Sequence, residues 1–224
     1  MDDALRIESL TGSAILPYLD ALARLRITVF REFPYLYDGS LAYEAEYLAT
    51  YGACAESLFV LARQGEAIVG VSTGIPLAAE TAAVKMPFEA AGLAPERVFY
   101  FGESVLLAPF RGQRIGARFF DAREAYARRL DRFNHTAFCA VDRPADHPLR
   151  PAGHRPLDGF WQRRGYVRRF DLRAAMRWKD IDQPAETAKS MVFWLRPLDR
   201  GSPAGGQSLS HRGDTGGPIM KTGS

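Results

Sequence analysis

The sequence predicts an α/β (α+β) domain, in which strands and helices alternate along most of the chain. Segments that alternate apolar and polar residues, typical of strands, are interspersed with segments whose apolar residues recur every three or four positions, as in helices. In Val98–Arg129 an apolar run reaches Pro109, passes through a glycine-bearing turn and opens into a long amphipathic segment. The composition agrees, since 47% hydrophobic and 25% charged residues are ordinary for a globular protein.

The element order read from these patterns is β-α-α-β-β-(α)-β-α-β-α-β-β. Proline, glycine and polar clusters separate the elements. In order, the prediction is a strand at Leu5–Ser9, helices at Ala14–Phe30 and Leu41–Tyr51, strands at Ser57–Arg63 and Ala67–Ile75, a helix around Ala79–Ala91, a strand at Val98–Leu107, a helix at Arg111–Arg132, a strand at Thr136–Val141, a helix at Leu157–Arg164, and strands at Tyr166–Arg173 and Ser190–Leu195.

One domain is expected over residues 1–198, followed by a tail at 199–224. The tail is rich in Gly, Ser, Pro and Thr, and it has few large apolar residues to offset the entropy cost of ordering. We therefore expect the tail to be disordered. The 224 residues are enough for one domain with a core of its own.

Charge and cysteine usage narrow the function classes. The net charge of +3 is too small for a nucleic-acid signature, but it fits a protein that handles an anionic cofactor. Cys54 and Cys139 lack metal-type spacing and predict no disulfide framework, which suits a reducing compartment. The acidic N-terminus shows no signal peptide, and no apolar run approaches the ~20 residues of a membrane span. The sequence therefore predicts a cytoplasmic protein with no metal site.

The turn before the long helix is the strongest candidate for a binding site. A helix start presents free backbone N–H groups and the positive end of the helix dipole, both of which favour phosphate. Arg111 and Arg114 add positive charge, and Gly112 and Gly116 allow close approach to the backbone. No Gly-Lys-Ser/Thr or G-x-G-x-x-G pattern is present. The alternative is an ordinary tight turn whose arginines are solvated.

This turn resembles motif A of the GNAT acetyltransferase superfamily, Gln/Arg-x-x-Gly-x-Gly/Ala. Arg111 and Gly116 match, whereas Arg114 stands where the first glycine is usual. A second segment, Phe160–Tyr166, resembles motif B, Tyr-x-x-x-Gly-Phe/Tyr, with Trp161 in place of the tyrosine. The resemblance covers residues 5–197 and implies a mixed central sheet flanked by helices. It also implies acetyl-CoA, or another acyl-CoA, as cofactor.

By this resemblance, the arm of the cofactor fills a gap between Val105–Leu107 and Phe138–Val141. The backbone N–H of Leu106 or Leu107 would then polarise the thioester carbonyl. The expected cofactor-binding residues are Val105, Leu106, Leu107, Arg111, Gly112, Gln113, Arg114, Ile115, Gly116 and Ala117.

Glu103 is the candidate catalytic base, because it is the carboxylate in an otherwise apolar and aromatic strand. The alternative is that Glu103 faces solvent or pairs with an arginine. Trp161 cannot supply the proton that the family's tyrosine gives to the leaving thiolate. Tyr166 is expected in the core. Either another group supplies that proton, for which His135, His147 and His154 are candidates, or the thiolate leaves without one.

The resemblance implies that the first two helices line the acceptor site, where Tyr35, Tyr37 and Glu44 are the candidate contacts. Aromatic rings and carboxylates can hold a cationic amine. The alternative for these residues is an aromatic satellite core with a solvated acidic face.

The sequence thus predicts an N-acyltransferase that joins the acyl group of acetyl-CoA to a small amine or a peptide amine by direct attack. The alternative is a catalytically weak acyl-CoA-binding sensor or partner module. A nucleic-acid or membrane partner is not expected, because acidic residues interrupt the arginines of the long helix and no membrane span is apparent.

Overall fold

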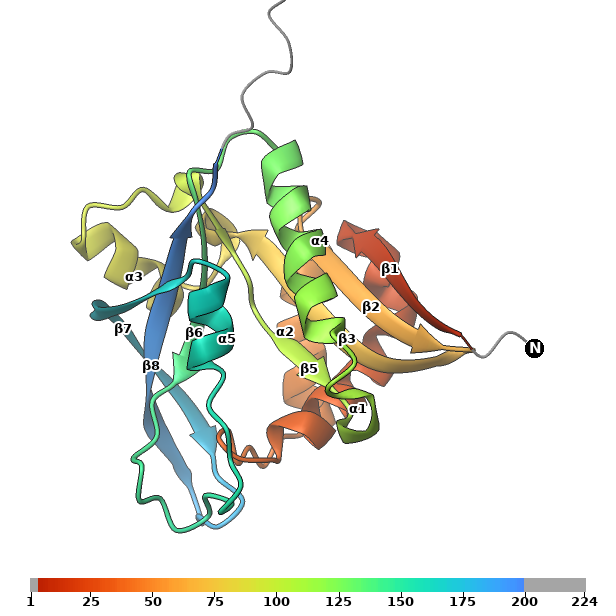
Figure 1. Cartoon of the computed structure of the whole chain (residues 1–224), viewed down its shortest axis with the longest axis vertical. Coiled ribbons are helices and arrows are strands. Elements are labelled where there is room, and N and C mark those ends of the chain that lie inside the picture. Colours follow the sequence, from red (N-terminus) through yellow and green to blue (C-terminus); the bar gives the residue numbers. More distant parts are fainter. Residues whose placement is uncertain (1–3, 200–224) are drawn as a thin grey trace, which may run out of the picture.

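The computed structural model describes residues 4–199, so the tail predicted at 199–224 lies almost entirely outside the described residues. Helices flank a central sheet on both faces (Figure 1). The strands are β1 Leu5–Thr11, β2 Leu58–Gln64, β3 Ala67–Pro76, β4 Val98–Tyr100, β5 Ser104–Leu106, β6 His135–Val141, β7 Val167–Lys179 and β8 Glu186–Pro197. The α-helices are α1 Leu19–Phe30, α2 Leu41–Ala53, α3 Ala82–Ala90, α4 Ile115–Arg129 and α5 Asp158–Arg163.

The sheet has the strand order β1-β2-β3-β4-β6-β8-β7, and β5 pairs with β3 beside this path. Strand β4 runs parallel to β6, and the other pairs are antiparallel. Parallel neighbours need a crossover connection, which the segment containing α4 supplies between β4 and β6. The sheet is therefore mixed, as the sequence analysis expected.

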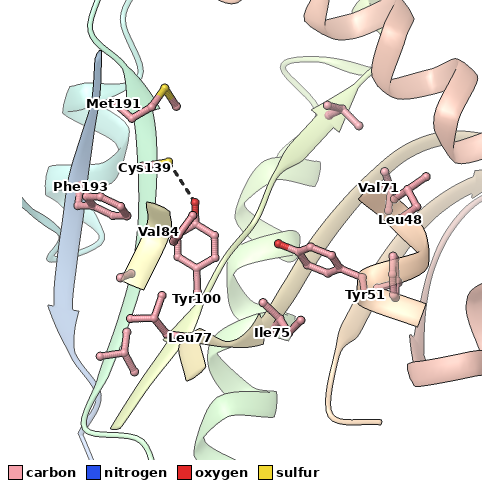
Figure 2. Packing of buried hydrophobic residues seen from close by; sticks show 14 of the residues in the cluster. Leu48, Tyr51, Val71, Ile75, Leu77, Val84, Tyr100, Cys139, Met191 and Phe193 are labelled. Carbon is pink, nitrogen blue, oxygen red and sulfur yellow. Dashed lines mark hydrogen bonds between the residues drawn. The ribbon is translucent and has the colours of Figure 1, made fainter. Parts of the chain in front are cut away.

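Each face of the sheet has its own apolar core. On one face, α1, α2 and α3 cover a cluster that includes Leu22, Leu48, Phe88 and Phe193. Figure 2 shows part of this cluster. On the other face, α4 packs over a second cluster, which contains Phe119. Alternate side chains of each strand enter opposite cores, which is why the strands read as nearly continuous apolar runs.

The single strand predicted at Val98–Leu107 is wrong, since two strands, β4 and β5, occupy that segment. The chain leaves regular geometry at Phe101–Glu103, where Gly102 passes very close to its neighbours. A Cβ at Gly102 would lie 2.3 Å from the Tyr51 hydroxyl and 2.7 Å from Thr73 Oγ1. Apolar content alone does not reveal this interruption, because both strands are apolar and the break is as buried as they are.

Two predicted helices start later than expected. The helix predicted from Ala14 begins as a 3₁₀ turn, Gly12–Tyr18, and α1 starts at Leu19. Pro17 explains the delay, because proline lacks the N–H and crowds the preceding turn of an α-helix. The helix predicted from Arg111 starts at Ile115, because Arg111–Arg114 form the turn before it. The last two strands are longer than predicted and form a hairpin.

An arginine clamps the α1–α2 connection, residues 31–40, to the β7–β8 hairpin. Arg143 donates to the carbonyl oxygens of Pro34 and Tyr35 at 2.9 and 2.8 Å. Its guanidinium also makes a bidentate pair with Asp180, at 2.8 and 2.9 Å. Asp180 is fully buried and also lies 3.3 Å from Lys189 Nζ. This clamp fixes one wall of the candidate site described below.

Cys54 and Cys139 are both free thiols, in agreement with the prediction of no disulfide. Within residues 4–199, none of the helices combines the length and the apolar character that a membrane span requires.

Asp180→Asn should lower the free energy of unfolding by about 3–5 kcal/mol, because it leaves Arg143, whose side chain is 10% exposed, and the buried Lys189 without their counter-charge. Chemical denaturation measures the change. Asp38→Asn is the matched control, since Asp38 pairs with Lys179 in the same region but is one-third exposed. Equal, small effects of both substitutions would show that the buried pair does not hold the connection in place.

Candidate active site

The sheet opens at the point where β4 ends. The N–H of Phe101 still donates to Ala137 of β6, at 2.7 Å. Beyond that bond, β5 pairs with β3, whereas β6 continues with β8. Strands β5 and β6 therefore run apart, as Figure 1 shows in the lower half of the view. This is the gap that the sequence analysis expected, and a cleft of about 660 Å³ occupies it.

One end of the cleft lies at the start of α4, where Arg111, Gly112 and Gly116 line it. No side chain caps this helix, and its first turn contains no acidic residue. Its first N–H groups are therefore open to an anion. A Cβ at Gly116 would meet nothing within 4 Å, so there is open space beside the helix start. Gln113, Arg114, Ile115 and Ala117 do not line the cleft.

Arg111 spans the cleft from the turn to the end of α1. Its guanidinium forms a bidentate pair with Glu32, at 2.7 and 3.0 Å, and its Nε donates to the carbonyl of Leu106. Both charged side chains are nearly half exposed. An anion at the helix start would therefore compete with Glu32 for this arginine.

The edge of β5 presents one of the two predicted backbone donors to the cleft. The N–H of Leu107 donates to Val69 of β3 at 3.0 Å, so it is already used. Hydrogen bonds alternate along an antiparallel strand, so the N–H of Leu106 faces away from β3, toward the gap. Leu106 also lines the cleft, whereas Val105 is fully buried in the core under α1 and α2. Of Val105, Leu106 and Leu107, it is therefore Leu106 that lines the cleft and turns its backbone N–H toward the gap.

Glu103 lines the cleft where the strands separate, and it is 7% exposed. Its Oε1 lies 2.6 Å from Nη1 of Arg26, and its Oε2 accepts a 3.0 Å hydrogen bond from Tyr47. Arg26 also pairs with the buried carboxylate of Glu44. Glu103 therefore pairs with an arginine, which was the stated alternative, while it remains beside the cleft.

The charges of this cluster do not cancel. Burial tends to lower the pKa of Arg26, but Glu103, Tyr47 and Glu44 outweigh burial and raise it, so Arg26 is charged. Two carboxylates around one guanidinium leave a net charge of −1 when both acids are ionised. The cluster consequently has the capacity to accept one proton.

The opposite wall, on β6 and α5, contains Cys139 and Trp161. The Cys139 thiol lies 3.0 Å from the Tyr100 hydroxyl, as Figure 2 shows. Burial raises the pKa of Cys139 to about 12, so the thiol remains protonated and is a poor nucleophile. Trp161 packs against Phe138 and Trp194. Cys139 lies within the segment Phe138–Val141 that the sequence analysis placed at the gap, although the pattern of β6 did not distinguish it from a core residue.

The residues considered as proton donors differ in whether they lie in the core, line the cleft or do neither. Tyr166 is buried, 2.9 Å from Thr136 Oγ1, and belongs to the core as predicted. His154 lines the cleft, whereas His135 and His147 do not. Burial and, to a smaller extent, Arg150 lower the pKa of His154, so its imidazole is neutral at pH 7.

The far end of the cleft differs from the predicted acceptor site. Tyr35 lines it, but Tyr37 and Glu44 do not. Instead, the loop of residues 142–157 closes this end, and the ring of His154 lies 4.7 Å from that of Phe33. In the sequence, the only indication of this loop's involvement was its content of Pro, His and Arg, which does not reveal the residues it packs against.

Solved structures with a similar fold include GNAT acetyltransferases. An acetyltransferase of the GNAT family from Streptococcus pneumoniae is 9% identical, with a TM-score of 0.52, and the match covers 88% of this chain and 100% of that one. An N-acetyltransferase from Staphylococcus aureus Mu50 is 9% identical, with a TM-score of 0.56 and coverage of 88% and 99%. The chain has the GNAT fold. The yncA protein of Salmonella typhimurium, solved with its cofactor acetyl-CoA, is 10% identical, with a TM-score of 0.53 and coverage of 89% and 98%.

No family model and no curated protein matches this sequence. At 9–10% identity the likeness establishes the GNAT fold, and the activity has to be argued from the cleft.

The backbone of the turn before α4 explains how the sequence can differ from the usual motif A at position 114. Arg114 stands where the family's first glycine is usual, and it has a left-handed backbone, with φ of 61°. Glycine adopts this conformation without strain, whereas other residues need about 1–2 kcal/mol. The unusual residue therefore keeps the usual backbone. Gly112, with φ of 79°, supplies the preceding left-handed position.

Proposed function

We propose that this protein is an acyl-CoA-dependent N-acyltransferase that transfers an acyl group, such as acetyl, to an amine. The observation that carries the proposal is the cleft between β5 and β6, which runs from the uncapped start of α4 to the buried Glu103 cluster. Both ends of this path suit the reaction. One can hold a diphosphate, and the other can accept a proton.

The residues that line the cleft fit an acyl-CoA. Gly112 and Gly116 leave room beside free N–H groups for the pyrophosphate, and Arg111 supplies positive charge once it leaves Glu32. The free edge of β5 can pair with an extended arm, as another strand would. Bound there, the group would supply an activated acyl thioester. The N–H of Leu106 is the donor placed to stabilise a developing oxyanion.

The chain's own groups account for the proton. Glu103 takes the proton of the attacking amine, because the cluster of Arg26, Glu44 and Glu103 has room for one more positive charge. Cys139 is protonated and buried, so direct attack by the amine is favoured over an acyl-enzyme. Tyr35 and the 142–157 loop form the wall against which the acceptor binds.

Acetyl-CoA at 100 times its dissociation constant should stabilise the protein by roughly 2.7 kcal/mol. Because each kcal/mol raises the Tm of a domain of this size by about 2–4 °C, the Tm should rise by several degrees. Differential scanning fluorimetry measures this increase. Gly116→Asp should abolish the increase by placing a carboxylate in the open space at the helix start. Gly153→Asp is the matched control, because Gly153 also faces open space but does not line the cleft. No Tm change of the wild type with millimolar acetyl-CoA would contradict the proposed function.

Glu103→Gln should lower kcat/KM by roughly 10²–10⁴-fold while leaving acetyl-CoA affinity nearly unchanged, because it removes the base and not the cofactor contacts. The loss should shrink as pH rises, since more of the amine is then unprotonated. The control is Glu46→Gln, on the exposed side of α2. The acceptor for this assay is first identified by screening a panel of amines for acetyl-CoA consumption by the wild type. Near wild-type activity of a folded Glu103→Gln protein would place the base elsewhere, and cofactor binding without any turnover would indicate a binding module.

A further inference from the structure

Arg123 is a buried arginine on the cleft wall with no acidic partner. It lies in the third turn of α4 and is 1% exposed. Its Nη1 donates to the carbonyl oxygens of Thr73 and Glu103, both at 3.2 Å, and its Nε donates to Phe119. Its Nη2 is buried and has no hydrogen-bond partner. Among the residues that the structure describes, no carboxylate oxygen lies within 4.0 Å of this guanidinium.

Two other arginines with little exposure show how unusual this is. Arg26, which is buried, pairs with Glu44 and Glu103, and Arg143, whose side chain is 10% exposed, pairs with Asp180. Burial lowers the pKa of Arg123 to about 10, which still leaves it charged at neutral pH. A buried, unpaired charge is costly, and its cost falls sharply when a carboxylate is supplied. Stacking of the guanidinium on the rings of Phe101 and Phe120, at 4.2 and 4.7 Å, offsets only part of that cost.

The position of Arg123 tells which part of a ligand would meet it. The carbonyl of Glu103 that it contacts is two residues beyond the last hydrogen bond between β4 and β6, so the guanidinium lies at the closed end of the gap. Gly116 lies two turns earlier on the same side of α4 and lines the outer end. If a ligand lies along α4 with one end beside Gly116, its other end therefore lies beside Arg123.

The Glu103 side chain occupies the other face of the sheet at this point, toward α1 and α2. The two faces thus present opposite charges. The positive face, under α4, is where the end of an acyl chain would lie, and the negative face is where an amine would approach.

We propose that Arg123 binds the terminal carboxylate of the acyl group, and that the acyl donor is a short dicarboxylic thioester of the malonyl or succinyl class. This inference rests on the proposed function, because it assumes that an acyl-CoA occupies the cleft. The planar guanidinium, with one amino group free, suits a carboxylate oxygen. A plain acetyl group would leave this charge unpaired.

The test compares the binding of CoA, acetyl-CoA, butyryl-CoA, malonyl-CoA and succinyl-CoA by isothermal titration calorimetry, without any acceptor. Butyryl-CoA has the same chain length as succinyl-CoA but lacks the carboxylate. The wild type should bind succinyl- or malonyl-CoA at least roughly tenfold more tightly than butyryl-CoA. This comparison needs no variant, so it remains decisive even if substitutions at Arg123 impair folding.

Arg123→Met should remove the preference while retaining the affinity for CoA. Arg123→Lys, which keeps the charge but loses the fork, should retain part of the preference. Arg129→Met is the matched control, because Arg129 is an exposed arginine at the far end of α4 and does not line the cleft. It should behave as the wild type does.

The outcomes separate the two proposals. Binding of butyryl-CoA as tight as that of succinyl- and malonyl-CoA would overturn the role of Arg123 and leave the acyltransferase proposal standing. A wild-type preference that survives unchanged in folded Arg123→Met would also overturn it. No binding of CoA or of any thioester would refute the proposed function itself.

Discussion

The loss of the β6 partner at Phe101–Glu103 is the constraint on which the rest of the site depends. Up to Phe101 the chain is bonded to both β3 and β6, and from Glu103 onward only its bonds to β3 continue. The backbone N–H of Thr73 donates to the Glu103 carbonyl at 3.0 Å, and Thr73 Oγ1 accepts from the Glu103 N–H at 3.2 Å. The residue between Phe101 and Glu103 has to be glycine, because a Cβ at position 102 would collide with Tyr51 and Thr73. The sheet can open only because β3 holds β5 in this way.

The opening also places two groups of charged side chains back to back. Two carboxylates, Glu44 and Glu103, surround Arg26 on the α1–α2 face, while Arg123 on the α4 face has no carboxylate oxygen of the described residues within 4.0 Å. Glu103 belongs to both, because its side chain binds Arg26 and its carbonyl binds Arg123. Buried charge is expensive, and under the proposals made here the acyl-CoA and the amine supply the counter-charges that these groups lack.

Much of this fold follows from the sequence. The element order was predicted from periodicity. The mixed sheet and the gap beside β6 were implied by the resemblance of two short motifs to those of the GNAT superfamily. Local signals failed where the cause was a distant neighbour. The break at Gly102 depends on Tyr51 and Thr73, which are far away in the chain. Likewise, Glu44 was predicted to contact the acceptor, with a solvated acidic face as the alternative, but it forms a buried pair with Arg26.

The candidate site was predicted less completely, for the same reason. The motif spacing identified Gly116, and the carboxylate in an otherwise apolar strand identified Glu103; both line the cleft. The spacing did not decide which backbone N–H faces the gap. It could not choose between Leu106 and Leu107, because that choice depends on which N–H faces Val69. Arg123 was not singled out because it is one of several arginines on α4, and nothing in the sequence marks it as buried. Cys139 was not singled out within the predicted gap segment because it fits the apolar pattern of β6. Their role depends on what packs against them in three dimensions.

Hydrogen–deuterium exchange with and without saturating acetyl-CoA tests most directly whether the open edge of β5 is the ligand site. Peptides spanning Ser104–Leu107 and Phe138–Val141 should gain protection when acetyl-CoA binds, while peptides at the end of the β7–β8 hairpin, near Lys179 and Glu186, should not change. Saturated binding that leaves exchange at β5 and β6 unaltered would place the cofactor elsewhere and refute the proposed site.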